Sequence, residues 1–171
     1  MSATLNRETL LADIHSAFAS IKTPESKTII AIDSACETSL VKILAAFDCP
    51  VGTIHTLDPQ SKMLMLRAKR GIPDFILDKV KVIPIGKGMA GIAAERMQPV
   101  QICNLQTDTS GVAKPSAKET KMEGSITAPM IVDGQLKGTL GIAKPIPYEF
   151  SEEETTVLMA AGELLAQLIE G

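Results

Sequence analysis

Three glycines, Gly86, Gly88 and Gly91, form a GxGxxG pattern in the stretch VIPIGKGMAGIAAERMQPVQICN. This spacing lets the backbone turn tightly and present the free amides of a helix start to a phosphate or another anion. In a dinucleotide-binding fold the pattern opens a full crossover helix, and further βα repeats follow it. Here Pro99 ends the helix after about Met97, and a hairpin comes next. The pattern therefore does not predict a Rossmann-type site.

The amides at the start of that short helix form a candidate anion site. Such amides carry partial positive charge, which favours an anionic group. Lys87, Lys114 and Lys118 are candidates for adding to this charge; the alternative is that the glycines serve close packing and the lysines are solvated. We expect a small polar or anionic ligand, held mainly by backbone hydrogen bonds. The candidate ligand-binding residues, which include polar groups of a later loop and strand, are Gly88, Met89, Ala90, Thr107, Asp108, Ser125 and Thr127.

The thiols and imidazoles do not form a pattern typical of catalysis or metal binding. Cys36, Cys49 and Cys103 are an odd number of cysteines without a CxxC pair, which argues against both a disulfide framework and a zinc site. We expect all three to be small core residues that react slowly with thiol reagents. His15 and His55 lie far apart in the sequence, so we expect no metal site.

Length, charge and hydropathy exclude several classes of protein. A chain of 171 residues is long enough for one domain with a proper core. The net charge of −3 provides no basic field for nucleic acid or acidic lipid. No apolar run approaches the roughly 18 residues of a membrane helix, and the N-terminus lacks the apolar core of a signal peptide. We therefore expect a soluble, cytoplasmic protein with no nucleic-acid or membrane partner.

The first helical segment carries a narrow apolar stripe at spacings of three and four residues, which is typical of a helix-helix seam. If two other helices already cover the sheet, this stripe has no sheet face left to pack on. We therefore predict a homodimer through a helical bundle that includes the C-terminal helix, with residues 1–26 as the dimerisation helix. The stripe consists of Leu11, Ile14, Phe18 and Ile21.

Two further helices are predicted from capping residues and periodicity. Thr23 followed by Pro24 opens a helical stretch that runs to Phe47, with Leu40, Val41, Ile43 and Leu44 as its apolar side. Ser151 and Glu154 form a capping box for a C-terminal helix. The apolar positions of that helix are Val157, Leu158, Ala161, Leu164, Leu165 and Leu168.

Between these helices the apolar pattern changes to a period of two, which predicts a sheet. Residues 51–57 and 63–68 form a first hairpin, and residues 125–132 and 135–143 form a second one around Asp133-Gly134. On the strand after Gly124, Ser125 and Thr127 face one side. We expect the other side, with Ile126, Ala128 and Met130, to meet the helices. The polar segment 105–124, roughly twenty residues long, is typical of a functional or mobile loop.

Four segments in this order resemble the GAF domain family: VGTIHTLDPQSKMLMLRAKRG, VIPIGKGMAGIAAERMQPVQICN, GSITAPMIVDGQLKGTLGIAK and FSEEE. The resemblance covers residues 27–171, which we assign to one GAF domain. It implies an α+β fold, GAF-like and PAS-related, with an antiparallel sheet of about six strands. The terminal helices would cover one face, and short helices with the long loop would cover a pocket on the other. A cavity is then expected between the start of the short helix at Gly88 and the loop 105–124.

The resemblance implies a non-catalytic small-molecule sensor or signalling module that acts through a partner protein or through its own dimer. The alternative is a redox enzyme resembling free methionine-(R)-sulfoxide reductase, a GAF protein with reactive cysteines in the glycine turn and the long loop. Here those places hold Met89-Ala90 and the segment 110–123, without a cysteine. We therefore expect no catalytic residue and no enzyme activity, and the pattern names no cofactor.

Two other branches of the family fit less well, and one reading needs no ligand. The pigment-binding branch needs a cysteine or histidine near the pocket helices, and only Cys103 lies between Gly71 and Asn104. The cyclic-nucleotide branch has a phenylalanine in its loop signature, and none lies between Phe75 and Phe150. The remaining hypothesis is that the protein is an interaction scaffold with a filled pocket. We expect a stand-alone domain with no output domain in the same chain, so that any signal leaves through an interface.

Overall fold

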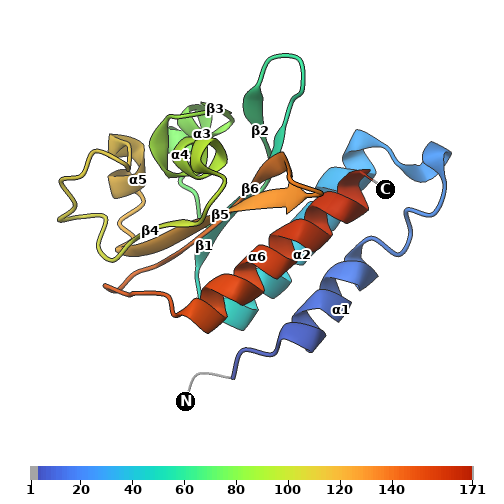
Figure 1. The fold of residues 1–171 in the computed structure, drawn as a ribbon, viewed down its shortest axis with the longest axis horizontal. Helices are drawn as coiled ribbons and strands as arrows, with labels where there is room; N and C mark the ends of the chain where they lie inside the picture. Colours follow the sequence, from blue (N-terminus) through green and yellow to red (C-terminus); the bar gives the residue numbers. More distant parts are fainter. Residues whose placement is uncertain (1–3, 171) are drawn as a thin grey trace.

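A computed structural model describes residues 4–170; residues 1–3 and 171, the outer ends of the two segments assigned above, lie outside the described part. Figure 1 shows a sheet with α1, α2 and α6 on one side and α3, α4 and α5 on the other. The elements in chain order are α1 (Arg7–Ala17), a 3₁₀ turn η1 (Pro24–Ser26), α2 (Ile29–Phe47), β1 (Val51–Leu57), β2 (Met63–Arg70), α3 (Asp74–Val80), β3 (Val82–Pro84), α4 (Gly88–Arg96), β4 (Val100–Ile102), α5 (Pro115–Glu119), β5 (Gly124–Val132), β6 (Gln135–Lys144) and α6 (Glu152–Glu170).

The sheet has six strands in the order β3-β2-β1-β6-β5-β4, and every neighbouring pair is antiparallel. The predicted second hairpin is present, and its two turn residues, Asp133 and Gly134, have φ values of 51° and 76°. Two positive φ angles in succession are typical of the type I′ turn that an Asp-Gly pair favours. The α+β class with a six-stranded antiparallel sheet is confirmed.

The face of the sheet that meets the long helices carries the apolar residues of the central strands. Ile126, Ala128 and Met130 of β5 and Leu140 and Ile142 of β6 are at most 2 % exposed. They form one core with side chains of α1, α2 and α6. The predicted orientation of β5 is therefore confirmed, and Ser125 and Thr127 lie on the opposite face.

The first helix packs within its own chain. Leu10, Ile14 and Phe18 are buried in the core, and α1 contacts both α2 and α6. The premise that this stripe lacks a surface to cover is wrong, because α2 and α6 leave a groove between them that α1 fills. The homodimer stays a prediction.

The second helix begins later than the sequence indicated. Thr23 caps only the short turn η1, with the Ser26 amide donating to Thr23 Oγ1 at 3.2 Å. The helix α2 starts after Thr28, whose hydroxyl accepts from the Ala31 amide at 3.1 Å. Val41 is 41 % exposed and does not belong to the apolar side of α2, because it lies about 100° around the helix from Leu40.

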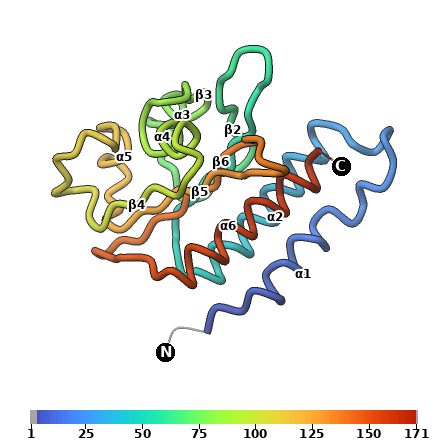
Figure 2. The backbone as a smooth tube through the Cα atoms, in the orientation of Figure 1, coloured from blue at the N-terminus to red at the C-terminus, as the bar shows by residue number. Residues whose placement is uncertain are grey.

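The C-terminal helix begins as predicted. The Glu154 amide donates to Ser151 Oγ at 3.1 Å, and the Ser151 amide donates to Glu154 Oε1 at 2.9 Å. Figure 2 shows the long segment between β4 and β5 as a loop that extends beyond the edge of the sheet and leads back to it by way of α5. Within residues 4–170, no helix is both long and apolar enough to cross a membrane.

Candidate ligand-binding site

The floor of the site is the face of the sheet that the long helices leave free. Because side chains alternate along a strand, β1 presents Thr53 and His55 on this face, and β5 presents Ser125 and Thr127. Gly141 of β6 lies between the two sets, paired in register with Thr53 on one side and with Thr127 on the other. The floor is therefore rich in small and hydroxylated residues.

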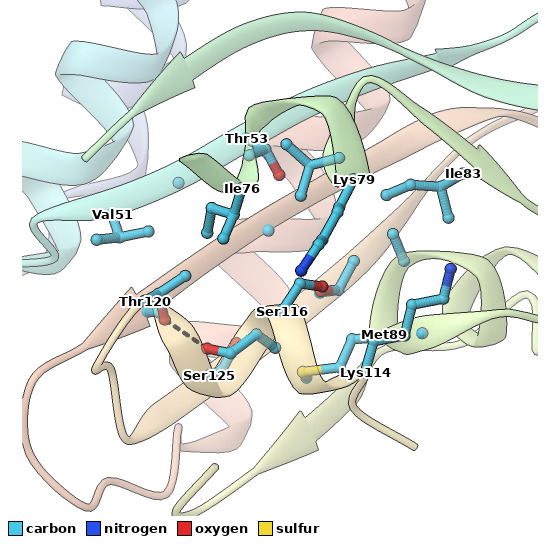
Figure 3. A pocket seen from close by; sticks show the side chains of 18 of the residues that line it. Val51, Thr53, Ile76, Lys79, Ile83, Met89, Lys114, Ser116, Thr120 and Ser125 are labelled. Atoms are coloured by element: carbon cyan, nitrogen blue, oxygen red, sulfur yellow. Dashed lines mark hydrogen bonds between the residues drawn. The ribbon is translucent and has the colours of Figure 1, made fainter. Parts of the chain in front are cut away.

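The roof consists of α3, the start of α4 and α5. Figure 3 shows Lys79 of α3 extending toward Ser116 of α5, with Thr53 on the strand of the floor. A partly open cavity of about 140 Å³ lies between floor and roof. Its lining is Val51, Gly52, Thr53, His55, Ile76, Lys79, Val80, Ile83, Lys87, Gly88, Met89, Ala90, Leu105, Lys114, Ser116, Ala117, Thr120, Ser125, Thr127, Gly141, Ile142 and Ala143.

The charges of the lining have one sign. Lys79, Lys87 and Lys114 line the cavity, and the described lining contains no carboxylate. Lys79 is paired with Glu119 at 3.5 Å, which links α3 to α5. Neither Lys87 nor Lys114 forms an ion pair with any residue between 4 and 170. The potential in the cavity therefore favours an anion.

The start of α4 adds donors to the same wall. Lys87 is the N-cap residue, and no side chain caps this helix. The amides of Gly88, Met89 and Ala90 precede the first intrahelical hydrogen bond, so they lack helical acceptors. Gly88 has φ +67°, a conformation that a residue without a Cβ adopts readily. This local geometry agrees with the sequence-based expectation of an anion site at this turn.

His55 fastens the roof to the floor. Its side chain is 1 % exposed, and Nε2 lies 2.7 Å from the carbonyl oxygen of Val80, the last residue of α3. Burial lowers the pKa of His55, and the bond to Val80 raises it by less. A neutral ring donates through Nε2–H, which leaves Nδ1 as an acceptor, and Nδ1 has no partner among the described residues.

Five of the seven predicted ligand-binding residues line this cavity: Gly88, Met89, Ala90, Ser125 and Thr127. The structure does not bring Thr107 and Asp108 to it. The Asp108 carboxylate accepts from Ser110 Oγ at 2.7 Å, and Lys118 Nζ donates to the Asp108 carbonyl at 3.2 Å. These contacts hold the first half of the long loop against itself, on a separate surface depression that includes Cys103. Lys118 lies outside the cavity as well.

Several lining residues were not predicted. Thr53 and His55 follow the alternation of β1, so the period of two that placed Ser125 and Thr127 also identifies them once the face of β1 is known. Lys79 and Ile76 come from the short helix α3, between β2 and β3. No local signal indicates that this helix covers the sheet.

All three cysteines lie outside the cavity. Cys36 and Cys49 are buried in the core with the long helices, and burial raises the pKa of each thiol to about 12. Cys103 is exposed, so its prediction as a core residue is wrong. It follows the short edge strand β4, where no further layer covers the chain. Across residues 4–170, no three histidine, cysteine or acidic side chains gather closely enough to hold a metal ion.

A family model described as GAF domain matches residues 31–170. No curated protein matches the sequence. Among solved structures, the GAF domain of a phosphoenolpyruvate-protein phosphotransferase (ptsP) from Coxiella burnetii is similar, with 21 % identity, coverage of 96 % of this chain and 93 % of that chain, and a TM-score of 0.76. A free methionine-R-sulfoxide reductase from Neisseria meningitidis in complex with its substrate has 17 % identity, coverage of 99 % and 96 %, and a TM-score of 0.74. The A. aeolicus nlh2 GAF domain in an inactive state has 19 % identity, coverage of 96 % and 95 %, and a TM-score of 0.69.

Proposed function

Since the chain belongs to the GAF domain family, we propose that it is a non-catalytic small-molecule sensor that signals through a protein partner or through its own dimer. GAF domains commonly act in sensing or signalling, and both signalling domains and reductases share this fold. The choice between these functions depends on the side chains of the site, because fold alone does not determine function.

The observation that carries the proposal is the cavity between the sheet and the roof. Its volume of about 140 Å³ is comparable to the roughly 150 Å³ cavity that takes up benzene in another protein. A ligand of roughly six to ten non-hydrogen atoms fits a space of this size. The roof over it consists of short elements, and segments of this kind are the ones that move when a ligand binds.

The chemistry of the lining supports binding over catalysis. A thiol-based reductase needs a thiolate at the bound substrate, and Cys36, Cys49 and Cys103 all lie elsewhere. The Nε2 atom of His55 is engaged with Val80, and the described lining contains no carboxylate to act as a general acid or base. The lining instead offers backbone amides, hydroxyls and ammonium groups, which bind without reacting.

The test combines native mass spectrometry, thermal unfolding and a turnover assay. We expect either a co-purified small molecule or a compound that raises the unfolding temperature, since a ligand at 100 times its Kd adds about 2.7 kcal/mol of stability. The purified protein with dithiothreitol should form no methionine from free methionine-(R)-sulfoxide. Methionine formation that disappears in a variant lacking all three cysteines would contradict the proposal.

A further inference from the structure

Two hydroxyl groups on the cavity floor converge over a glycine. Thr53 of β1 and Thr127 of β5 flank Gly141 of β6 in register, so all three lie in one row across the sheet. A Cβ atom at position 141 would lie 3.2 Å from Thr127 Oγ1 and 3.5 Å from Thr53 Oγ1. The glycine therefore leaves a space bounded by two oxygen atoms that are both donors and acceptors.

Neither hydroxyl is used by the fold. Thr127 is only 5 % exposed, yet neither its hydroxyl nor that of Thr53 has a hydrogen-bond partner within residues 4–170. Ser125, the next residue on this face of β5, does donate, to the Ile142 carbonyl at 3.3 Å. Both threonines line the cavity, and neither hydroxyl oxygen is among the fully buried, unpartnered polar atoms of residues 4–170, so a bound group can reach the pair and complete its hydrogen bonds.

The wall of the cavity at α4 is cationic. Lys87 and Lys114 have no carboxylate partner in the described chain, and they flank the uncapped start of α4 at Gly88. The lining also contains the apolar side chains of Ile76, Ile83 and Met89, and a third lysine, Lys79, whose ammonium is paired with Glu119. The cavity therefore combines an anion-binding rim at α4 with apolar side chains and a neutral hydrogen-bonding floor.

We propose that the ligand is a short organic acid that carries a hydroxyl or carbonyl oxygen away from its acid group. The anionic group binds at Lys87, Lys114 and the amides that begin α4. The neutral oxygen occupies the space over Gly141 and bonds both threonine hydroxyls. The inference rests on the proposed function, because it assigns a ligand class and a specificity-determining pair to the same cavity.

Variants of the floor separate recognition from folding. Thr127→Val keeps the shape of the side chain and removes only the hydroxyl, so we expect about five- to tenfold weaker binding of the hydroxy or oxo acid. The unfolding temperature of the ligand-free protein should stay the same or rise, because the substitution removes no hydrogen bond within the described chain; a structural role would lower it. Gly141→Ala should weaken binding as well, by filling the space over the glycine.

Variants of the rim test the charge. Lys87→Gln and Lys114→Gln should each weaken binding of every acid, whether or not it carries a second oxygen. Lys118→Gln is the matched control, because Lys118 is a lysine of α5 outside the cavity lining. A Lys118→Gln variant that weakens binding as much as Lys114→Gln would show that only the diffuse charge of the protein attracts the acid, which overturns the assigned rim.

The deciding experiment is titration calorimetry with hydroxy and oxo carboxylic acids of about four to six carbons. The affinity of each is compared with that of the same acid without the hydroxyl or oxo group, and with that of its neutral amide. We expect at least one substituted acid to bind about tenfold more tightly than both analogues, and Thr127→Val to remove its advantage over the unsubstituted acid. Equal binding of substituted and unsubstituted acids, or no binding of any acid, overturns the inference.

The outcomes also separate this inference from the proposed function. If none of the acids binds while a neutral compound co-purifies or raises the unfolding temperature, the sensor function stands and the ligand class is wrong. If a substituted acid binds as expected but is converted to a product, the ligand class stands and the non-catalytic function is wrong.

Discussion

Two buried polar side chains connect elements that lie far apart in the sequence. Lys144, which is 7 % exposed, donates from β6 to the carbonyls of Phe47 and Asp48 at 2.6 and 3.0 Å. Its charge complements the C-terminal end of α2 and lies 4.7 Å from the centre of the Tyr148 ring. His55 performs the corresponding task on the other face, where it holds α3 over the cavity. Lys144 thus connects the sheet to the long helices, and His55 connects it to the helices over the cavity.

The histidine makes the stability dependent on pH. Burial lowers the pKa of His55 below its ordinary value of 6.5, so the unfolded chain takes up a proton that the folded chain does not. Stability rises with pH wherever the unfolded state binds more protons. We expect the free energy of unfolding to fall as the pH is lowered from 7 through 6.5 toward 5, by up to about 1.4 kcal/mol per pH unit.

Urea unfolding at a series of pH values measures this slope. His55→Gln, which keeps an N–H donor for Val80, should lose most of the pH dependence. His15→Gln removes an exposed histidine and is expected to keep the wild-type slope. The same slope in all three proteins would mean that His55 is not the group responsible.

The cysteines differ in reactivity because they differ in burial. Cys36 and Cys49 are buried with a pKa of about 12, so little thiolate is present near neutral pH. We expect a chromogenic disulfide reagent to label one thiol per folded chain, at the exposed Cys103, and all three thiols in denaturant. Cys103→Ser should abolish labelling of the folded protein without changing ligand binding. Loss of binding in that variant would contradict the assigned site.

At the scale of elements, the roof depends on a few specific contacts. The pair Lys79–Glu119 connects α3 with α5, and both side chains are partly exposed, so it contributes less than about 1 kcal/mol. Gln106 stabilises the end of α5 and the residues after it, because its Nε2 donates to the carbonyls of Lys118 and Met122 at 3.0 and 2.8 Å. We expect such a roof to open for ligand entry at a lower cost in free energy than unfolding of the core.

The turn before α4 is the element whose shape matters most for binding. Gly88→Val places a branched side chain beside Lys114, whose Cγ lies 3.5 Å from a Cβ at this position, and forces valine into φ +67°. We expect binding of the best acid to weaken at least about tenfold. Gly111→Val is the matched control, since Gly111 has φ +81° and open space around it. Equal effects of the two variants on binding would show that backbone strain alone is responsible.

Hydrogen exchange should divide the long loop into two parts. Lys114, Ser116, Ala117 and Thr120 line the cavity, whereas the residues from 107 to 110 line the separate depression. With the best acid bound, we expect slower exchange at residues 88–90 and 114–120 and no change at 107–111. Slower exchange confined to residues 107–111 would show that the acid binds instead at the depression around Asp108.

At the scale of the whole molecule, the protein is a sheet with a helical layer on one face and a ligand-sized cavity under the other. Strands β1, β5 and β6 belong to both, because their alternate residues face the core and the cavity. A ligand that shifts these strands therefore acts on the helices through a packed core, which transmits strain well. The outward side of α2 carries exposed apolar residues, with Ile29 63 % and Ile30 83 % exposed.

We predict that the protein is a homodimer through the helical layer, including the outward side of α2. Ile30→Glu should sediment as a monomer at micromolar concentration while keeping its unfolding temperature, because the side chain is exposed in the single chain. Ile14→Glu is expected to destabilise the fold instead, since Ile14 is fully buried. Gln60→Glu adds the same charge on the exposed turn after β1 and should stay dimeric. A monomeric wild-type protein would refute the prediction.

Features that depend only on neighbouring residues could be predicted from the sequence. The Asp133-Gly134 turn, the Ser151–Glu154 capping box and the short helix at Gly88 are present because their hydrogen bonds and φ angles are set within a few residues. Alternation along β5 also identified which side chains leave the core. The resemblance to a family then supplied the order of the layers.

The tertiary structure alone decided which of these features meet. Thr53 and Thr127 converge over Gly141 only because β6 pairs with both β1 and β5, a pairing that no local pattern encodes. Periodicity showed that α1 has an apolar stripe but not that α2 and α6 of the same chain cover it. The path of the long loop placed Thr107 and Asp108 away from the cavity. A period identifies the face of an element, whereas the contact made by that face depends on packing between distant segments.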